Sequence, residues 1–388
     1  MTVGLLYESP ENDENGIKLT AEQLGIDLKI IPFRKIAVTI SQNGYKFASK
    51  GKDFTETIKN VSTILNRAQS KNRRIYSAHL METLGKKVIN PFSIEFICYS
   101  KFRTLLNLWS SGLPIPKTVY VPCDPADIVK ENQVINNELD IAELFIQELG
   151  NEIVIKPDAG THGKSIVLSK NKEELITNIQ QIKPSIINPI GVMSQEFIQK
   201  WFYDLRIIVY KEAGKNIACH PVGLARAGFN DFRTNTFLGN LVFDTALSPH
   251  ICELAEKCGK ALAGNHEAWV LGLDAMINDG VKKTNDEVVK NQLGKAAATF
   301  NEVKKIQKDS TRLRDFKTWN SNLEAAVEKY KNTEPYREIK NIIEQNIESN
   351  QSNIVFHEAN ACPDFWENTR LITGMNLAIP LLKSAQNL

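Results

Sequence analysis

The stretch IVFHEANA, residues 354–361, decides the fold, because a short apolar run ends there on an acid and an amide. Residues two apart on a strand point to the same side of the sheet, so Glu358 and Asn360 are expected to share one face. A carboxylate at the end of an apolar strand costs free energy unless it is paired or coordinates a cation. The stretch therefore predicts a core strand that ends in chemically active groups.

The run WVLGLDAMI, residues 269–277, is the matching strand upstream, almost continuously apolar and typical of a strand buried on both faces. Asp274 interrupts it in the way that Glu358 interrupts the later strand. If the two strands are neighbours, Asp274, Glu358 and Asn360 converge as oxygen ligands, which suits Mg²⁺ shared with phosphate oxygens. The alternative is that these acids simply form ion pairs with nearby arginines.

Residues 152–169, EIVIKPDAGTHGKSIVLS, predict a strand, a glycine-bearing loop and a second strand. Lys156 ends the first strand and supplies a compact positive charge, while the loop lets backbone N–H groups approach phosphate oxygens. The pattern differs from the G-x4-GK[ST] loop, and no helix follows directly. An ordinary hairpin turn is the alternative.

A third group of polar residues follows in SQEFI (194–198), DLRIIVY (204–210) and DFRTN (231–235). Backbone groups at the end of the first of these strands are suited to the edge of an adenine. Asp204 and Arg206 share a strand face, and arginine recognises phosphate or carboxylate in a bidentate manner. A solvated surface is the commoner location for any single arginine.

Composition places the chain among globular proteins of two or three domains: 388 residues, 42% apolar and 24% charged. With 47 basic and 45 acidic residues, bulk charge gives no sign of a nucleic-acid partner. No apolar run reaches the roughly 18 residues that cross a bilayer, and the N-terminus turns acidic early, so we expect a cytoplasmic protein without a membrane partner. Six scattered cysteines without a C-x-x-C pair disfavour a disulfide scaffold or a zinc ribbon.

Strand–helix alternation over the first third of the chain predicts a small α/β domain with a parallel sheet. Residues 91–111 are expected to form one helix, which ends near a domain boundary at the glycine and prolines of 112–116. Residues 281–352 form a long polar insertion with helical spacing, expected as a solvated helical hairpin or a mobile arm. One functional version of this insertion docks an acidic carrier protein or a second subunit.

The order of these motifs resembles the ATP-grasp superfamily, and within it the RimK-like carboxylate–amine ligases. The order is Lys101 on a helix, IVIKP with its glycine loop, QEFI, DLR, an arginine followed by RTN, LGLDAM and HEANA. The stretch from Ile64 to Thr118 resembles LysX-type ligases, which join an amino acid to a carrier protein. The resemblance covers nearly the whole chain except 281–352.

The resemblance implies an α/β fold with α+β character: an ATP-grasp fold with an N-terminal pre-ATP-grasp α/β domain and a helical insertion. The expected divisions are 1–115, an ATP-grasp small subdomain at 116–193, and a large subdomain at 194–388 with the insertion 281–352. The cofactors implied are ATP and two Mg²⁺ ions, with Mn²⁺ as an alternative metal.

The resemblance also implies a role for each candidate residue. The expected ATP-binding residues are Lys101, Lys156, Gly160, Thr161, His162, Gly163, Lys164, Gln195, Glu196, Phe197, Ile198 and Asp204. The expected metal ligands are Asp274, Glu358 and Asn360. The expected catalytic residues are Arg226 and Arg206, and the expected substrate-binding residues are Arg233 and Asn235. Cys362 follows Asn360 closely, and we expect it to pack rather than to act as a nucleophile.

The implied activity is ATP-dependent amide or peptide bond formation through an acyl phosphate, adding an amino acid such as glutamate to a small molecule or a carrier or protein acceptor. A small-molecule kinase and a nucleotide-binding scaffold without turnover are the alternatives. The sequence leaves open whether the protein forms a homo-oligomer. The texts TNTFLGN and EANACPDFWEN depart from the family pattern where the acceptor amine would bind, so the sequence does not name the substrates.

Overall fold

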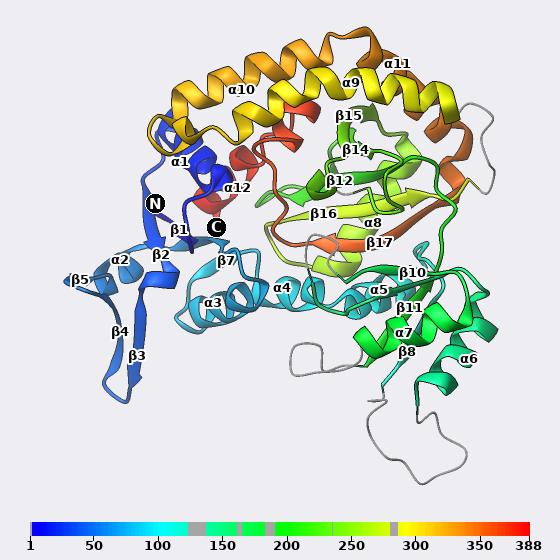
Figure 1. The fold of residues 1–388 in the computed structure, drawn as a ribbon. Helices are drawn as coiled ribbons and strands as arrows, with labels where there is room; N and C mark the ends of the chain where they lie inside the picture. The colour runs from blue at the N-terminus through cyan, green and yellow to red at the C-terminus, as the bar shows by residue number, and fades with distance from the viewer. Residues whose placement is uncertain (1, 123–136, 161–164, 183–190, 235, 280–285) are drawn as a thin grey trace.

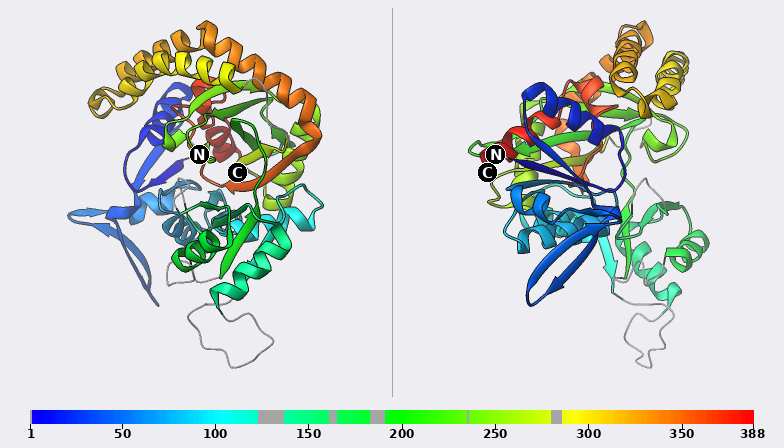
Figure 2. Two further views of the ribbon diagram at one scale, coloured as in Figure 1. Left: turned by 45° about the vertical axis from the view of Figure 1, so that its right-hand side comes forward. Right: turned by 90° about the vertical axis from the view of Figure 1, so that its left-hand side faces the viewer.

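The computed structural model describes residues 2–122, 137–160, 165–182, 191–234, 236–279 and 286–388, and builds them around three main sheets (Figures 1 and 2). The mixture of helices and strands confirms the expected α/β class. Among the described residues, no helix combines the length and the apolar character that crossing a membrane requires.

The first sheet is parallel, in the order β2-β1-β6-β7, as the strand–helix alternation predicts. Its strands are β1 (Val3–Tyr7), β2 (Leu28–Pro32), β6 (Thr63–Arg67) and β7 (Lys87–Ile89). Its helices are α1 (Asn12–Leu24), α2 (Thr55–Asn60), α3 (Lys71–Thr83) and α4 (Phe92–Tyr99), with a 3-10 turn η1 (Phe33–Lys35). A small antiparallel sheet of β3 (Ala37–Ser41), β4 (Gly44–Ser49) and β5 (Lys52–Asp53) projects from this part of the molecule (Figure 1).

The single helix expected over 91–111 is wrong, because the chain breaks at Ser100 and starts α5 (Lys101–Ser110). The Ser100 hydroxyl accepts a hydrogen bond from the Arg103 N–H (3.0 Å), which is the bond of an N-cap. The break places Lys101 in the first turn of a new helix, where it is buried.

The second sheet is antiparallel, in the order β10-β9-β11-β8. Its strands are β8 (Thr118–Val121), β9 (Ile153–Lys156), β10 (Val167–Ser169) and β11 (Val192–Glu196), with α6 (Glu138–Leu149) and α7 (Lys172–Ile182) packed on it. The two strands expected within 152–169 are confirmed by the antiparallel pairing of β9 with β10, while residues 161–164 of the expected loop lie outside the described residues. The division expected after residue 193 falls inside β11, and the three-part division of the chain stays a prediction.

The third sheet is antiparallel, in the order β15-β14-β12-β16-β17, with β13 paired to β12. Its strands are β12 (Tyr203–Lys211), β13 (Ile217–Cys219), β14 (Val222–Ala227), β15 (Leu241–Ala246), β16 (Trp269–Ile277) and β17 (Ile354–Asn360). Around it lie α8 (Pro249–Ala263), the 3-10 turn η2 (Thr236–Leu238) and a π-helical turn η5 (Thr369–Thr373), whereas α12 (Ala378–Asn387) packs against α1, β1 and β6 of the first sheet. The two apolar runs of the sequence are thus neighbouring strands.

Over its described residues, 286–352, the insertion forms three helices rather than a two-helix hairpin or a mobile arm. They are α9 (Asp286–Gln307), α10 (Phe316–Lys331) and α11 (Glu334–Asn350), with 3-10 turns η3 (Ser310–Leu313) and η4 (Gln351–Asn353). The helices arch over one side of the third sheet (Figure 1). Their apolar faces join the main core, and the Tyr330 hydroxyl donates to the Val242 carbonyl of β15 (3.1 Å). The insertion is therefore an integral part of the fold.

Candidate active site

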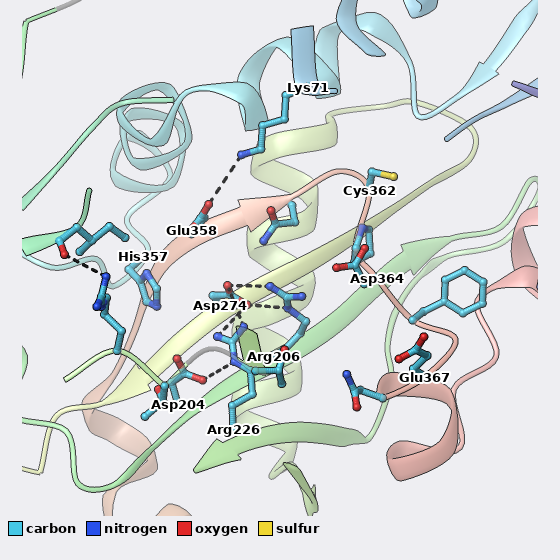
Figure 3. A pocket seen from close by; sticks show the side chains of 18 of the residues that line it. Lys71, Asp204, Arg206, Arg226, Asp274, His357, Glu358, Cys362, Asp364 and Glu367 are labelled. Atoms are coloured by element: carbon cyan, nitrogen blue, oxygen red, sulfur yellow. Dashed lines mark hydrogen bonds and ion pairs between the residues drawn. The ribbon is translucent and has the colours of Figure 1, made fainter. Parts of the chain in front are cut away.

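A cavity of about 710 Å³ opens where the three sheets meet. Side chains from all three sheets line it, and Figure 3 shows a part of it from close by. Every described candidate residue of the sequence analysis lines this cavity except Lys101 and Gly160, and both of these make contacts to lining residues. Thr161, His162, Gly163, Lys164 and Asn235 lie outside the described residues.

The expected metal ligands converge because β16 and β17 are antiparallel neighbours. Asp274 pairs with Glu358, and Gly272 pairs with Asn360, so the carboxylates and the amide leave the sheet on one face. All three side chains line the cavity. Two carboxylates and an amide oxygen fit Mg²⁺, which usually takes one or two protein carboxylates and completes its shell with water and phosphate oxygens.

A β-bulge brings a further residue to this face. The register shifts after Asp274, so that Ala275 pairs with Phe356 and His357 is left as the extra residue. His357 lines the cavity with Glu358. Burial and the charge of Lys156 lower the pKa of His357 to about 4, so the imidazole is neutral at pH 7. No sequence pattern points to His357, because strand alternation alone directs it to the face opposite Glu358.

Asp274 is held by two arginines. Arg206 Nε lies 2.9 Å from Oδ1 and its Nη2 lies 3.0 Å from Oδ2, while Arg226 Nη2 lies 3.4 Å from Oδ1 (Figure 3). Burial alone would raise the pKa of Asp274, but the two guanidinium groups lower it well below its usual range. In the structure Asp274 forms the ion pairs of that alternative, and its role as a metal ligand stays a prediction. Among the described residues, no group of three His, Cys, Asp or Glu side chains is placed to hold a metal by itself.

Glu358 faces lysines instead. Lys71 Nζ lies 3.9 Å and Lys101 Nζ lies 4.0 Å from Glu358 Oε1. Burial opposes ionisation, but these ammonium groups lower the pKa of Glu358. Lys156 is buried near them, and desolvation lowers its pKa to about 8. A buried cluster of lysines beside one carboxylate is an environment for a polyanion.

The base of the glycine loop is tied to the start of α5. Asp158 accepts hydrogen bonds from the Ser100 hydroxyl (2.8 Å) and from the Phe102 N–H (2.9 Å), and its carbonyl accepts one from the Lys101 N–H (3.0 Å). These bonds hold Lys101 close to Gly160, where a Cβ atom built on the glycine would lie 3.9 Å from Lys101 Nζ. Lys101 and the segment from Asp158 to Gly160 are therefore neighbours, although they are far apart in the sequence.

The end of β11 borders the other half of the cavity. Gln195, Glu196, Phe197 and Ile198 line it, and the Glu196 carboxylate accepts a hydrogen bond from the Lys117 N–H (2.7 Å). Lys200, which the sequence analysis did not single out, is half-buried, lines the same cavity and donates to the Thr234 hydroxyl (2.9 Å). Desolvation lowers the pKa of Lys200 to about 8.

The other arginine candidates are also paired. Arg226 Nε lies 2.6 Å from Asp204 Oδ1, and the two residues are directly opposite on β14 and β12. Arg233 binds the Asp231 carboxylate through Nε (2.9 Å) and Nη2 (2.7 Å). Arg226 and Arg206 therefore form one charged network with Asp204 and Asp274, whereas Arg233 belongs to a separate pair.

The far end of the cavity has acids that sequence reasoning missed. Asp13 Oδ2 accepts from Arg67 Nη2 (2.6 Å), and Asp13 Oδ1 accepts from the Trp366 N–H (2.8 Å). Burial and neighbouring acids raise the pKa of Asp13 to about 7. Glu11, Glu14, Asp364 and Glu367 lie at the same end. Burial also raises the pKa of Cys362 to about 11, so its thiol stays protonated at neutral pH.

The three sheets, the hairpin that carries the glycine loop and the lysine-lined cavity define an enzyme of the ATP-grasp fold. Two solved structures support this over the whole chain. D-alanyl-alanine synthetase A from Vibrio cholerae matches with a TM-score of 0.58 at 9% identity, covering 100% of this chain and 98% of its own. The ATP-grasp ligase PsnB, complexed with minimal precursor, Mg and ADP, matches with a TM-score of 0.53 at 11% identity, covering 99% and 97%.

Sequence comparisons indicate which branch of the ATP-grasp proteins the chain resembles. Residues 123–291 match the family model of the RimK-like ATP-grasp domain. The chain is 28% identical over 240 residues to an alpha-aminoadipate–LysW ligase, LysX, of Saccharolobus solfataricus (60% of this chain, 78% of the relative). It is 29% identical over 200 residues to a coenzyme gamma-F420-2:alpha-L-glutamate ligase of Methanocaldococcus jannaschii (50% and 59%). The chain contains a RimK-like ATP-grasp domain and is an ATP-dependent carboxylate–amine ligase, as the resemblance implied.

Proposed function

We propose that this ligase forms an amide through an acyl phosphate, with an amino acid such as glutamate as one substrate and a small molecule or a carrier or protein as the acceptor. The observation that carries the proposal is the convergence of Asp274, Glu358 and Asn360 on one cavity face, beside the lysines that contact or surround Glu358. The names of the relatives, an aminoadipate–carrier ligase and a glutamate ligase, support the choice of an amino acid.

The chemistry explains why such groups are needed. A carboxylate carries a negative charge and lacks a leaving group, so an amine does not displace its oxygen. Transfer of the γ-phosphoryl group of ATP to a carboxylate oxygen yields ADP and an acyl phosphate. The amine then attacks the acyl carbon, inorganic phosphate leaves with that oxygen, and the amine loses a proton. Both steps depend mainly on positioning and on charge stabilisation.

In this proposal Lys101 and Lys156 bind the phosphates and keep their negative charge compatible with a buried site. Arg226 neutralises charge on the transferring group, and Arg206 binds the substrate carboxylate. Asp274, Glu358 and Asn360 would hold Mg²⁺, as two ions, which supplies charge neutralisation for the phosphoryl oxygens when it is bound. The backbone from Gln195 to Ile198 binds adenine, and Asp204 binds the ribose.

An ADP-release screen tests the proposal. Purified protein is incubated with ATP, Mg²⁺ and pairs of amino acids, dicarboxylates and amine acceptors, and the products are identified by mass spectrometry. We expect ADP, phosphate and an amide in equal amounts from at least one pair. A stable phosphoester without an amide would instead identify a kinase, and nucleotide binding without ADP from any pair would indicate a scaffold.

A further inference from the structure

Lys71 is a lysine of the active cavity to which the sequence analysis gave no role. It is the first residue of α3 and follows Ser70, the N-cap of that helix, just after the carboxyl end of β6. In parallel α/β sheets, ligands bind outside the carboxyl ends of the strands. The side chain is 13% exposed and lines the cavity. The first sheet therefore places the nearly buried ammonium group of Lys71 in a site whose other candidate residues come mainly from the other two sheets.

The ammonium group of Lys71 lies between Gly160 and β17, the strand that carries Glu358. Its Nζ donates a hydrogen bond to the Gly160 carbonyl (3.1 Å) and lies 3.9 Å from Glu358 Oε1. Figure 3 shows the side chain extending from its helix toward Glu358. An ammonium group has three donors, so the bond to Gly160 leaves others for a second acceptor.

The charge balance at this place indicates what the second acceptor is. Lys71 and Lys101 both approach Glu358 within about 4 Å, and Lys156 is buried close enough for the charges of Glu358 and Lys101 to shift its pKa. Two ammonium groups thus share the Glu358 carboxylate, and a third, that of Lys156, is buried within reach of the same charges. When Glu358 is engaged by a cation, these lysines need other anionic partners, because a buried unpaired charge is costly.

We propose that Lys71 binds the terminal phosphoryl group of ATP while it keeps its hydrogen bond to the Gly160 carbonyl. The inference rests on the proposed function, because it places the triphosphate beside Glu358. Lys71 then distinguishes ATP from ADP: with ATP its ammonium group binds both the Gly160 carbonyl and the third phosphate, and with ADP it returns to Glu358. The first sheet thereby senses whether phosphoryl transfer has taken place.

The test compares the affinities of the full-length Lys71→Met variant and the unaltered protein for ATP and for ADP, by calorimetry with Mg²⁺ and without acid or amine. A charged hydrogen bond to the third phosphate predicts that the variant loses about ten- to a hundredfold in affinity for ATP and much less for ADP. Lys71→Arg is expected to restore part of the preference for ATP. Lys46→Met, an exposed lysine of β4 in the same part of the chain, is the matched control and should bind both nucleotides normally.

Equal losses for ATP and ADP would overturn the proposal, since a general or structural role affects both nucleotides alike. Unchanged nucleotide affinities with a lower Mg²⁺ requirement would also overturn it, because Lys71 would then be only a counter-ion of Glu358. The ratio of the affinities for ATP and for ADP can be measured without any catalytic turnover. Failure of this proposal is therefore distinct from failure of the ligase proposal, which the ADP-release screen detects.

Discussion

Glu358 is the residue on which most of the site depends, because it is both an expected metal ligand and the shared partner of Lys71 and Lys101. Glu358→Gln keeps the shape of the side chain and removes its charge. We expect ADP formation to fall by about 10²–10³-fold, the range for loss of one electrostatic group in an active site. A coupled assay for ADP measures the change.

The control for this variant is Glu267→Gln, since Glu267 is an exposed acid whose partner Lys87 is also exposed. Its activity should equal that of the unaltered protein. Near-normal ADP formation by Glu358→Gln would remove Glu358 from the expected metal ligands.

We expect Lys156 to make nucleotide binding depend on pH. Burial lowers its pKa to about 8, and a bound triphosphate would favour the ammonium form and so raise that pKa. Affinity for ATP is therefore full below pH 8 and falls as the pH rises above it, by up to about tenfold per pH unit. Binding constants measured by calorimetry on both sides of pH 8 give this slope.

Lys156→Arg decides whether Lys156 causes the slope, because arginine stays charged throughout this range. The variant is expected to bind ATP with an affinity that no longer falls above pH 8. Lys200 lines the same cavity with a pKa of about 8. A slope that persists in Lys156→Arg would assign the pH dependence to Lys200 and contradict the expectation.

At this scale, the sequence could predict residues whose position follows from alternation along one strand. Glu358, Asn360 and Asp274 are such residues, and they line one cavity. It could not predict that Asp274 is paired with Arg206 and Arg226, because those contacts depend on the order of strands in the sheet. The assigned chemical roles remain predictions for the experiments above.

The insertion shows how an element can be recognised while its packing is missed. Its helical spacing predicted helices, but its many charged residues suggested a solvated hairpin. The structure instead packs three helices against β15, where the Tyr336 hydroxyl bonds Asp244 and Lys340 Nζ lies 2.7 Å from the same carboxylate. Composition averages over both faces of a helix, so it hid the buried apolar stripe.

Leu323 of α10 tests this packing because it is fully buried. Leu323→Ala should lower the free energy of unfolding by about 2–5 kcal/mol, the cost of lost burial plus a cavity. Leu313 of η3 is the matched control because it is 71% exposed. Leu313→Ala should change the free energy of unfolding by less than about 0.5 kcal/mol. Urea denaturation measures both. Equal, small effects would mean that the insertion does not contribute to the core.

Two other elements depart from the sequence expectations for local reasons. The helix expected over 91–111 divides because Ser100 forms an N-cap within a segment of continuous helical periodicity. The bulge that turns His357 toward the cavity shifts the register between β16 and β17. A one-residue change in strand register reverses side-chain directions, and a single sequence carries no signal for it.

The molecule as a whole brings together groups that are distant in the chain. Lys71 comes from the first sheet, Lys156 from the second, and Asp274 and Glu358 from the third. The motif order could predict this assembly because it resembles one superfamily, and whole-chain likeness to solved ATP-grasp structures confirms the fold. The acceptor was not predictable, since the stretches TNTFLGN and EANACPDFWEN depart from the family pattern where the resemblance places the acceptor amine.

The most direct test of the acyl phosphate is the fate of one oxygen atom. Once the ADP-release screen has identified the acid, that acid is supplied with ¹⁸O in its carboxylate, and the released phosphate is analysed by mass spectrometry. If both carboxylate oxygens are labelled and the reaction passes through an acyl phosphate, every phosphate released with an amide carries one ¹⁸O atom. Amide formation with unlabelled phosphate would contradict the acyl-phosphate account.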